Sequence, residues 1–264
     1  MTPTVLLVHG AFADGSSWNK VIARLRAAGL AARAVANPLR GLTSDGEYVA
    51  SVVSQTEGDV VLVGHSYGGP VVTYAGSSAP NVKALVLVAA FGLDKGENAQ
   101  DAPAGFPETQ LSGALQAWTY PGSDLPELTL QPGKYRAVFA ADVSEEEAAA
   151  GAANQRPAAA LGFGEPLAVE PAWRRLPTWW VIPSRDNAIN PEYQRATADK
   201  IGAKVIELEG GSHSIPVSRP IEVAENHTDH VAECVVTGNA IARFHTGRKA
   251  TTSSLTILPL RSIR

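Results

Sequence analysis

Cysteine is almost absent from this chain. Its 264 residues include a single cysteine, Cys234, so no intrachain disulfide can form. This usage is compatible with a reducing compartment and leads us to expect a cytoplasmic location, although it leaves secretion open. Cys234 lies near His227 and His230, but their spacing fits no common zinc pattern, so we predict no metal site.

Long apolar runs and a strong charge imbalance are absent as well. No run of about 18 apolar residues occurs, so no membrane span is expected. The N-terminus lacks both a basic region and a cleavable apolar segment, so we expect no signal peptide. The 22 basic and 26 acidic residues give a formal net charge of −4, which offers no support for nucleic-acid binding.

What the sequence does contain is an alternation of short apolar runs with helical patterns. The apolar runs predict strands at 5–8, 32–35, 60–63, 84–89, 178–182 and 204–208, and the helical patterns lie at 15–29, 44–55, 70–77 and 191–201. Strands that are apolar on both faces are typical of a buried parallel sheet. The predicted fold class is therefore α/β, with a mostly parallel central sheet and helices on both faces.

Two regions interrupt this alternation. The segment at about 95–175 is rich in Pro, Ala and Glu, and it contains a capping box formed by Ser144 and Glu147. We expect it to form a small, mostly helical cap insertion within a single domain that spans 1–225. Residues 226–264 lose the amphipathic pattern and carry five basic residues against two acidic ones. We expect an atypical tail there, either partly disordered or an unusual extension.

The most informative segment is Gly64-His65-Ser66-Tyr67-Gly68, which follows the expected strand at 60–63 and precedes a helix. This arrangement is typical of a nucleophile elbow, in which a strained turn lifts a serine hydroxyl above the sheet edge. Glycine is needed at 64 and 68 because a Cβ there would collide with the neighbouring strand or helix. We predict that Ser66 is a catalytic nucleophile; the alternative is a serine that caps the helix.

A serine nucleophile needs a general base, which this architecture places late in the chain. His213 follows the expected strand at 204–208 and therefore lies at the sheet edge where α/β proteins place their sites. We select His213 over His9 and His65, which adjoin the backbone of the site and are better interpreted as structural.

The base in turn needs a carboxylate to fix its tautomer. Asp186 follows the expected strand at 178–182, and the chain order Ser66, Asp186, His213 matches the order expected for such a triad. The alternative interpretation of Asp186 is a residue that caps a turn. Asp94, after the fourth expected strand, is the second candidate for the acid.

Ester cleavage also requires amide donors for the oxyanion and a pocket for the substrate. We predict that the N–H groups of Tyr67 and Ala11 supply the donors, with Phe12 as the second choice after Ala11. Phe12, Phe91 and Trp118 are the predicted substrate-binding residues, although aromatic side chains in such chains are often simply core. They come from a wider set of aromatic residues that also includes Tyr67, Phe106 and Tyr120.

With these motifs, the chain from Val5 to about Ala224 resembles the α/β-hydrolase superfamily. It is most similar to the small esterase and hydroxynitrile-lyase branch, which includes plant methylesterases. The motifs that carry the resemblance are His9-Gly10-Ala11, Gly15-Ser16-Ser17-Trp18, Gly64-His65-Ser66-Tyr67-Gly68-Gly69, Asp186-Asn187-Ala188-Ile189-Asn190-Pro191-Glu192 and Gly210-Gly211-Ser212-His213. The resemblance implies a carboxylesterase that cleaves small apolar esters through an acyl-enzyme without a metal or cofactor.

Three other functions stay open. Lyases of this branch typically carry a lysine after the catalytic histidine and a threonine after the first-loop histidine, whereas this chain has Ser214 and Gly10. A cofactor-free perhydrolase would use the same catalytic residues. A non-catalytic ligand-binding receptor would not need all three members of the triad. The expected partner is a small-molecule ester, and a homodimer is left open.

Overall fold

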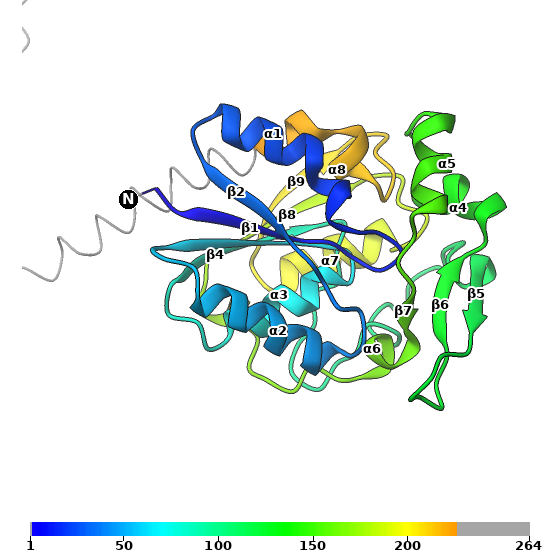
Figure 1. The fold of residues 1–264 in the computed structure, drawn as a ribbon, viewed down its shortest axis with the longest axis horizontal. Helices are drawn as coiled ribbons and strands as arrows, with labels where there is room; N and C mark the ends of the chain where they lie inside the picture. The colour runs from blue at the N-terminus through cyan, green and yellow to red at the C-terminus, as the bar shows by residue number, and fades with distance from the viewer. Residues whose placement is uncertain (1, 226–264) are drawn as a thin grey trace, which may run out of the picture.

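The computed structural model describes residues 2–225 and places six parallel strands in the order β2-β1-β3-β4-β8-β9 (Figure 1). Their bounds lie close to the predicted ones: β1 Thr4–Val8, β2 Ala31–Val35, β3 Val60–His65, β4 Val82–Val88, β8 Thr178–Pro183 and β9 Lys204–Leu208. The predicted α/β class with a mostly parallel sheet is confirmed.

The sheet separates two apolar cores because successive side chains of a strand point to opposite faces. On one face Leu6 and Leu62 pack with α2 (Leu42–Ser54), α3 (Gly68–Gly76) and α7 (Pro191–Lys200). Alternate strand residues pack on the other face with Trp18 of η1 (Gly15–Trp18), with α1 (Asn19–Ala27) and with α8 (Ile215–Ser218). Figure 1 shows α1 and α8 on one side of the sheet and α2 and α3 on the other.

The insertion between β4 and β8 contains more than the predicted helices. Its helices are η2 Ser112–Ala114, α4 Pro132–Phe139, α5 Glu145–Ala153, α6 Ala160–Gly164 and η3 Ala172–Arg174, and Ser144 caps α5 as expected. It also contains a three-stranded antiparallel sheet of β5 (Leu115–Trp118), β6 (Glu127–Leu130) and β7 (Ala158–Ala159). The sequence does not indicate this sheet, because its strands are short and β5 has no buried face that would impose an apolar alternation.

The insertion is hydrogen-bonded to the loop that follows β8. Asn187 donates through Nδ2 to the carbonyl of Ala137 at 2.9 Å, and its own carbonyl accepts from the Gln110 amide at 3.2 Å. Asn190 donates to the carbonyl of Pro107 at 2.8 Å. Because β8 is parallel to its neighbours, this loop lies at the carboxyl edge of the sheet, and the insertion therefore covers that edge.

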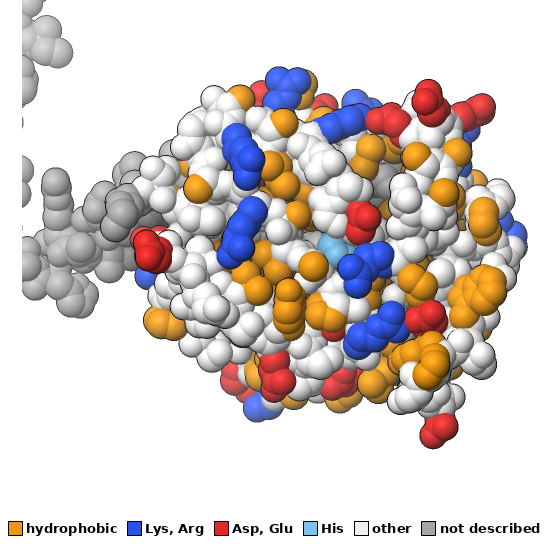
Figure 2. All heavy atoms as spheres, viewed as in Figure 1, with side chains coloured by type: hydrophobic (Ala, Val, Ile, Leu, Met, Phe, Trp, Pro, Cys, Tyr) orange, Lys and Arg blue, Asp and Glu red, His pale blue; other side chains and the backbone are white. Residues whose placement is uncertain are grey.

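The surface in Figure 2 mixes side chains of both charges, with hydrophobic side chains between them. Within residues 2–225, no helix is long and apolar enough to cross a membrane. The chain is helical at 220–225, and the predicted atypical tail, 226–264, lies outside the described residues.

The packing of α2 on α3 depends on Gly46, where an added Cβ would lie 2.4 Å from the Tyr74 ring. We expect Gly46→Ala to lower the free energy of unfolding by about 1–3 kcal/mol through overpacking, although alanine favours helices. Gly133→Ala in α4 is the matched control because nothing lies within 4 Å of its added Cβ. This control should gain at most about 0.5–1 kcal/mol, because Gly133 lies in the first turn of α4 and not in its middle. Urea unfolding measures both, and a Gly46→Ala protein as stable as the control would contradict the packing argument.

Candidate active site

The turn around Ser66 has the backbone of a strained elbow. Ser66 has φ of 54°, in the left-handed region that residues with a side chain rarely adopt, and it is 7% exposed. A Cβ at Gly64 would lie 2.4 Å from the carbonyl oxygen of Gly68, and one at Gly68 would lie 2.6 Å from that of Val8. Both glycines are therefore required by backbone contacts, as the sequence analysis predicted.

The loop after β1 passes directly against the serine. A Cβ at Gly10 would lie 2.6 Å from the Ser66 Cβ and 2.8 Å from the His65 carbonyl oxygen. Ala11 and Phe12 follow in this loop, and both are buried. The two predicted oxyanion donors, the amides of Ala11 and Tyr67, thus belong to the two segments that meet at Ser66.

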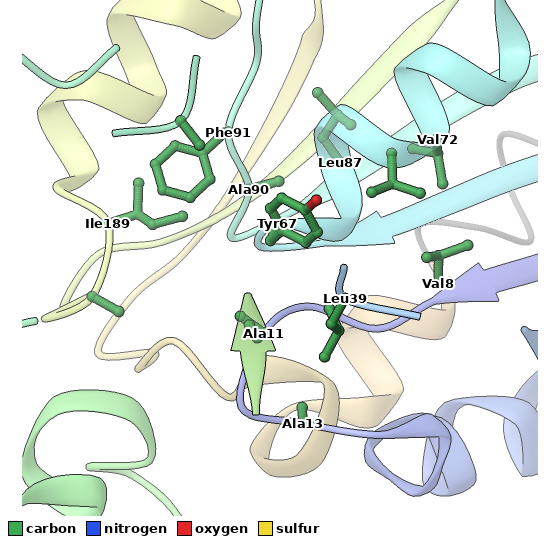
Figure 3. Close-up of a cluster of buried hydrophobic side chains, with 14 of the residues drawn as sticks. Val8, Ala11, Ala13, Leu39, Tyr67, Val72, Leu87, Ala90, Phe91 and Ile189 are labelled. Carbon is green, nitrogen blue, oxygen red and sulfur yellow. The ribbon is translucent and has the colours of Figure 1, made fainter. Parts of the chain in front are cut away.

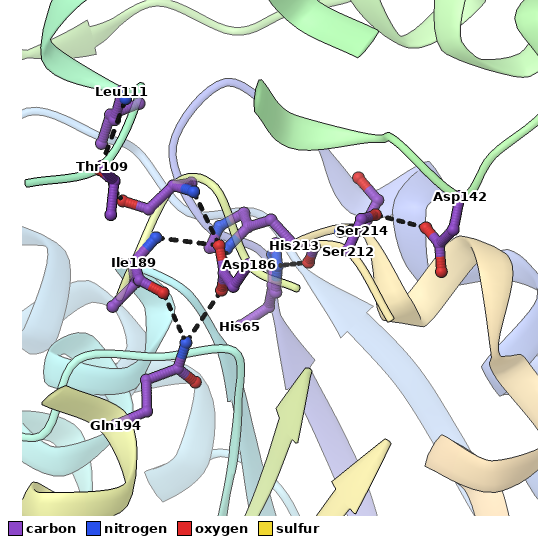
Figure 4. A network of polar contacts seen from close by, with 11 residues as sticks. His65, Thr109, Leu111, Asp142, Asp186, Ile189, Gln194, Ser212, His213 and Ser214 are labelled. Carbon is purple, nitrogen blue, oxygen red and sulfur yellow. Dashed lines mark hydrogen bonds and ion pairs between the residues drawn. The ribbon is translucent and has the colours of Figure 1, made fainter. Parts of the chain in front are cut away.

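His213 and Asp186 form a buried pair (Figure 4). His213 donates from Nδ1 to Oδ2 of Asp186 at 2.9 Å, and their side chains are 1% and 0% exposed. Because a carboxylate only accepts hydrogen bonds, Nδ1 carries the proton and Nε2 of the neutral ring is left as an acceptor. This tautomer is the one that a general base requires.

Three further donors hold the Asp186 carboxylate. The amides of Ala188 and Ile189 donate to Oδ1 at 2.8 and 2.9 Å, and Gln194 donates to Oδ2 at 2.9 Å. Gln194 was not predicted from the sequence. The available signal was its position on the buried side of α7, where helical spacing places it with Ala198.

The structure brings the His213 loop against the end of β3. His65, the residue before Ser66, donates from Nε2 to the His213 carbonyl oxygen at 2.9 Å. Asp94, the second candidate for the acid, pairs with Arg174 at 2.7 Å and not with His213.

The side chain of Tyr67 is hydrogen-bonded to α2. Its hydroxyl donates to Oδ2 of Asp45 at 2.9 Å, and both residues are buried. Asp45 also accepts from the amides of Arg40 and Gly41 at the start of α2. Burial raises the pKa of Asp45 despite these hydrogen bonds. Asp45, which the sequence analysis also missed, therefore anchors the residue that follows the candidate nucleophile.

His9 is held by backbone groups. Its Nε2 accepts from the Asn37 amide at 3.0 Å, so Nδ1 carries the proton and donates to the Gly10 carbonyl at 2.9 Å. Burial lowers the pKa of His9, and burial followed by the nearby His213 lowers the pKa of His65 well below its ordinary value. Both rings therefore stay neutral under conditions in which an exposed histidine would titrate.

A largely apolar cavity of about 660 Å³ lies between the loop after β1, the insertion and the loop after β8, and neither Ser66 nor His213 is among its lining residues. Phe12 and Phe91 line it, and Figure 3 shows Phe91 beside Ile189 with Tyr67 and Ala11 nearby. Trp118 is not among the lining residues; it lies on β5, 48% exposed, and donates to Thr129 at 2.8 Å. The other walls come from the insertion and the loop after β8: Ala99, Gln100, 103–109, Leu111, Ser112, Leu115, Leu128, Phe163, Ala188, Ile189 and Asn190.

Comparison with known proteins shows the family of this chain. The sequence model of the alpha/beta hydrolase family matches residues 5–226, so the chain belongs to that family. No significant match to a curated protein sequence was found. Among residues 2–225, no three or more His, Cys, Asp or Glu side chains are grouped so that they could hold a metal ion.

The fold is also shared with several solved structures. Polyneuridine aldehyde esterase is 22% identical, with a TM-score of 0.76 over 87% of this chain and 99% of its own. A methylesterase protein from Arabidopsis is 20% identical, with a TM-score of 0.74 over 87% and 99%. A pyrethroid hydrolase from Sphingobium faniae is 19% identical, with a TM-score of 0.72 over 88% and 98%. The predicted resemblance to α/β hydrolases is confirmed.

The lowered pKa values of His9 and His65 predict how stability depends on pH. The unfolded chain binds protons at these positions below the ordinary value of 6.5, whereas the folded chain binds them only at lower pH. The free energy of unfolding should therefore fall as the pH decreases from 6.5, by up to about 1.4 kcal/mol per pH unit for each group. Urea unfolding at several pH values between 7.5 and 5.5 measures this slope. His65→Gln should reduce it, and an unchanged slope in that variant would contradict the assignment.

Proposed function

We propose that this protein is a carboxylic ester hydrolase in which Ser66 is the nucleophile, His213 the general base and Asp186 the residue that orients it. The observation that carries the proposal is the buried Asp186–His213 hydrogen bond beside a strained serine elbow. A buried charge is costly unless several donors satisfy it, and Asp186 has four. Such an arrangement is expected where an imidazolium must be stabilised.

In this mechanism, Nε2 of His213 accepts the proton of the Ser66 hydroxyl as its oxygen attacks the ester carbonyl carbon. Asp186 stabilises the imidazolium that forms, and the amides of Ala11 and Tyr67 bind the negatively charged oxygen of the tetrahedral intermediate. His213 then protonates the departing alcohol, which leaves an acyl group on Ser66. Water, deprotonated by His213, releases the acid and restores the serine. This sequence of steps uses no cofactor.

The cavity supports a neutral substrate with an apolar part. Its walls are mainly aromatic and aliphatic, with Glu108 as the one charged side chain among the lining residues. An anionic substrate group would lose its hydration there without gaining a partner of opposite sign, because Glu108 carries a negative charge as well. The structural relatives support ester chemistry through their names, which describe a methylesterase, an aldehyde esterase and a pyrethroid hydrolase.

The esterase is favoured over the hydroxynitrile lyase because Ser214, not lysine, follows His213. A perhydrolase would share the proposed catalytic residues and is distinguished by assay with acetate and peroxide. A non-catalytic receptor would have no need for the Asp186 network. The cytoplasmic location, the exclusion of nucleic-acid and membrane partners and the homodimer stay predictions.

The nucleophile can be tested with Ser66→Ala and p-nitrophenyl acetate and butyrate as substrates. We expect kcat to fall by at least about 10³-fold, because a triad without its nucleophile retains only the contributions of binding and the oxyanion hole. A serine-reactive phosphonate should label the wild type and not the variant. Ser51→Ala, on the exposed face of α2, is the matched control and should behave as wild type. Turnover or labelling that persists in Ser66→Ala would refute the proposal.

The cavity predicts a preference among acyl chains. Leu111→Trp should fill part of it and lower kcat/KM for p-nitrophenyl octanoate about 10-fold or more, with acetate changed less than about 3-fold, because each apolar group in a pocket contributes about 1–3 kcal/mol. Trp118→Ala is the control, because that side chain lies outside the cavity. A chain-length preference altered by Trp118→Ala and not by Leu111→Trp would contradict the role of this cavity and restore Trp118 as a substrate-binding residue.

A further inference from the structure

His65 is a buried histidine that takes no part in the proposed mechanism. It ends β3, directly before Ser66, and only 2% of it is exposed. Its Nε2 lies 2.9 Å from the carbonyl oxygen of His213. Figure 4 labels both residues. A carbonyl oxygen only accepts, so Nε2 carries the proton and donates it. One hydrogen bond therefore joins the residue before the proposed nucleophile to the backbone of the proposed base.

The surroundings of the other ring nitrogen indicate that this hydrogen bond is the reason a histidine occupies position 65. Nδ1 is buried and, within residues 2–225, has no hydrogen-bond partner. An unpaired buried acceptor destabilises a protein, and an apolar side chain of similar volume would avoid that cost. Burial, with a smaller effect from His213, lowers the pKa of His65 well below its ordinary value, so the ring acts as a neutral donor.

The neighbouring rings hold His65 in one orientation. Trp18 and Phe139 lie edge-on to it, with ring centroids 6.2 and 6.0 Å away, and the His213 ring is 4.7 Å away. Phe139 also packs on the His213 ring at 4.7 Å. Because these contacts come from η1, from the insertion and from the base loop, rotation of the His65 ring away from His213 is sterically opposed.

The hydrogen bonds of Asp186 and of the Ser66 amide do not set the position of the His213 backbone relative to Ser66, and His65 can do so. Asp186 fixes the Nδ1 side of the His213 ring, but it does not fix the backbone that carries the ring. Ser66 is fixed on the sheet through its amide, which donates to the Val88 carbonyl at 3.1 Å. His65 is the link between these two units, and a misplacement of about 1 Å at a reacting pair can cost about 10²-fold in rate.

We propose that His65 is a positioning residue, whose hydrogen bond to the His213 carbonyl holds the base loop in register with the nucleophile elbow. The proposal rests on the proposed function, because it concerns the same Ser66 and His213.

Two amide substitutions separate this role from simple packing. In His65→Gln the side-chain amide reaches about as far as the imidazole Nε2, so it can donate to the same carbonyl. In His65→Asn the amide reaches only as far as Nδ1 and cannot. Thr73→Val is the control for loss of polarity, because it alters another buried polar group that has no partner in the described part of the chain. Each protein is assayed with p-nitrophenyl acetate and labelled with the phosphonate, and urea unfolding is measured in parallel.

We expect His65→Asn to lower kcat and the labelling rate about 10- to 100-fold with KM changed less than about 3-fold. His65→Gln should recover most of this loss, and Thr73→Val should match wild type. Equal rates in the Asn and Gln variants, whether both low or both normal, would overturn the proposal. The proposal would also be overturned if the loss of kcat in these variants followed their free energy of unfolding and not the distance that the side-chain amide can reach.

The proposed function fails separately from this inference. If Ser66→Ala retains turnover, the esterase assignment is wrong whatever the His65 variants do. If Ser66→Ala is inactive while His65→Asn equals wild type, the esterase assignment stands and only the positioning role is lost. If His65→Asn does not fold, comparison of His65→Gln with His65→Met decides, because methionine fills similar space without a donor; equal rates in those two would again overturn the proposal.

Discussion

The close approach of three backbone segments around Ser66 is the constraint on which the rest of this structure depends. The loop after β1, the end of β3 and the start of α3 meet where a Cβ at Gly10, Gly64 or Gly68 would lie 2.4–2.6 Å from another atom. This crowding holds Ser66 in a left-handed conformation that it would not adopt alone. The apolar cores on both faces of the sheet stabilise the fold and so maintain this local strain.

The polar groups of the site are buried and almost completely paired, which is how a protein keeps charge in its interior. Asp186 accepts hydrogen bonds from four donors, one of which is His213. Asp45 accepts a hydrogen bond from the Tyr67 hydroxyl. Each network starts from a different helix, α7 or α2, so the geometry of the site depends on the packing of the whole domain. His65 adds a further buried hydrogen bond, from the elbow to the backbone carbonyl of His213 in the base loop.

The insertion contributes both to the cavity for a substrate and to the support of the site residues. It forms much of the cavity wall and is hydrogen-bonded to the loop that carries Asp186. It also reaches the other side of the base: Asp142 accepts hydrogen bonds from the hydroxyls of Ser212 and Ser218, on either side of His213. Changes in the insertion can therefore alter both the space available to a substrate and the support of the proposed base.

Local features of the sequence determined the strands, the helices, the elbow at Ser66 and the chain order of the candidate triad. These features are readable because glycine at a crowded turn and the period of apolar residues are imposed by nearby backbone geometry. The roles of Gln194, Asp45 and His65, the place of Trp118 outside the cavity and the small antiparallel sheet were decided only by tertiary structure. These features depend on which distant segments meet and on the direction in which a side chain points. Local spacing in the sequence encodes neither of these two properties.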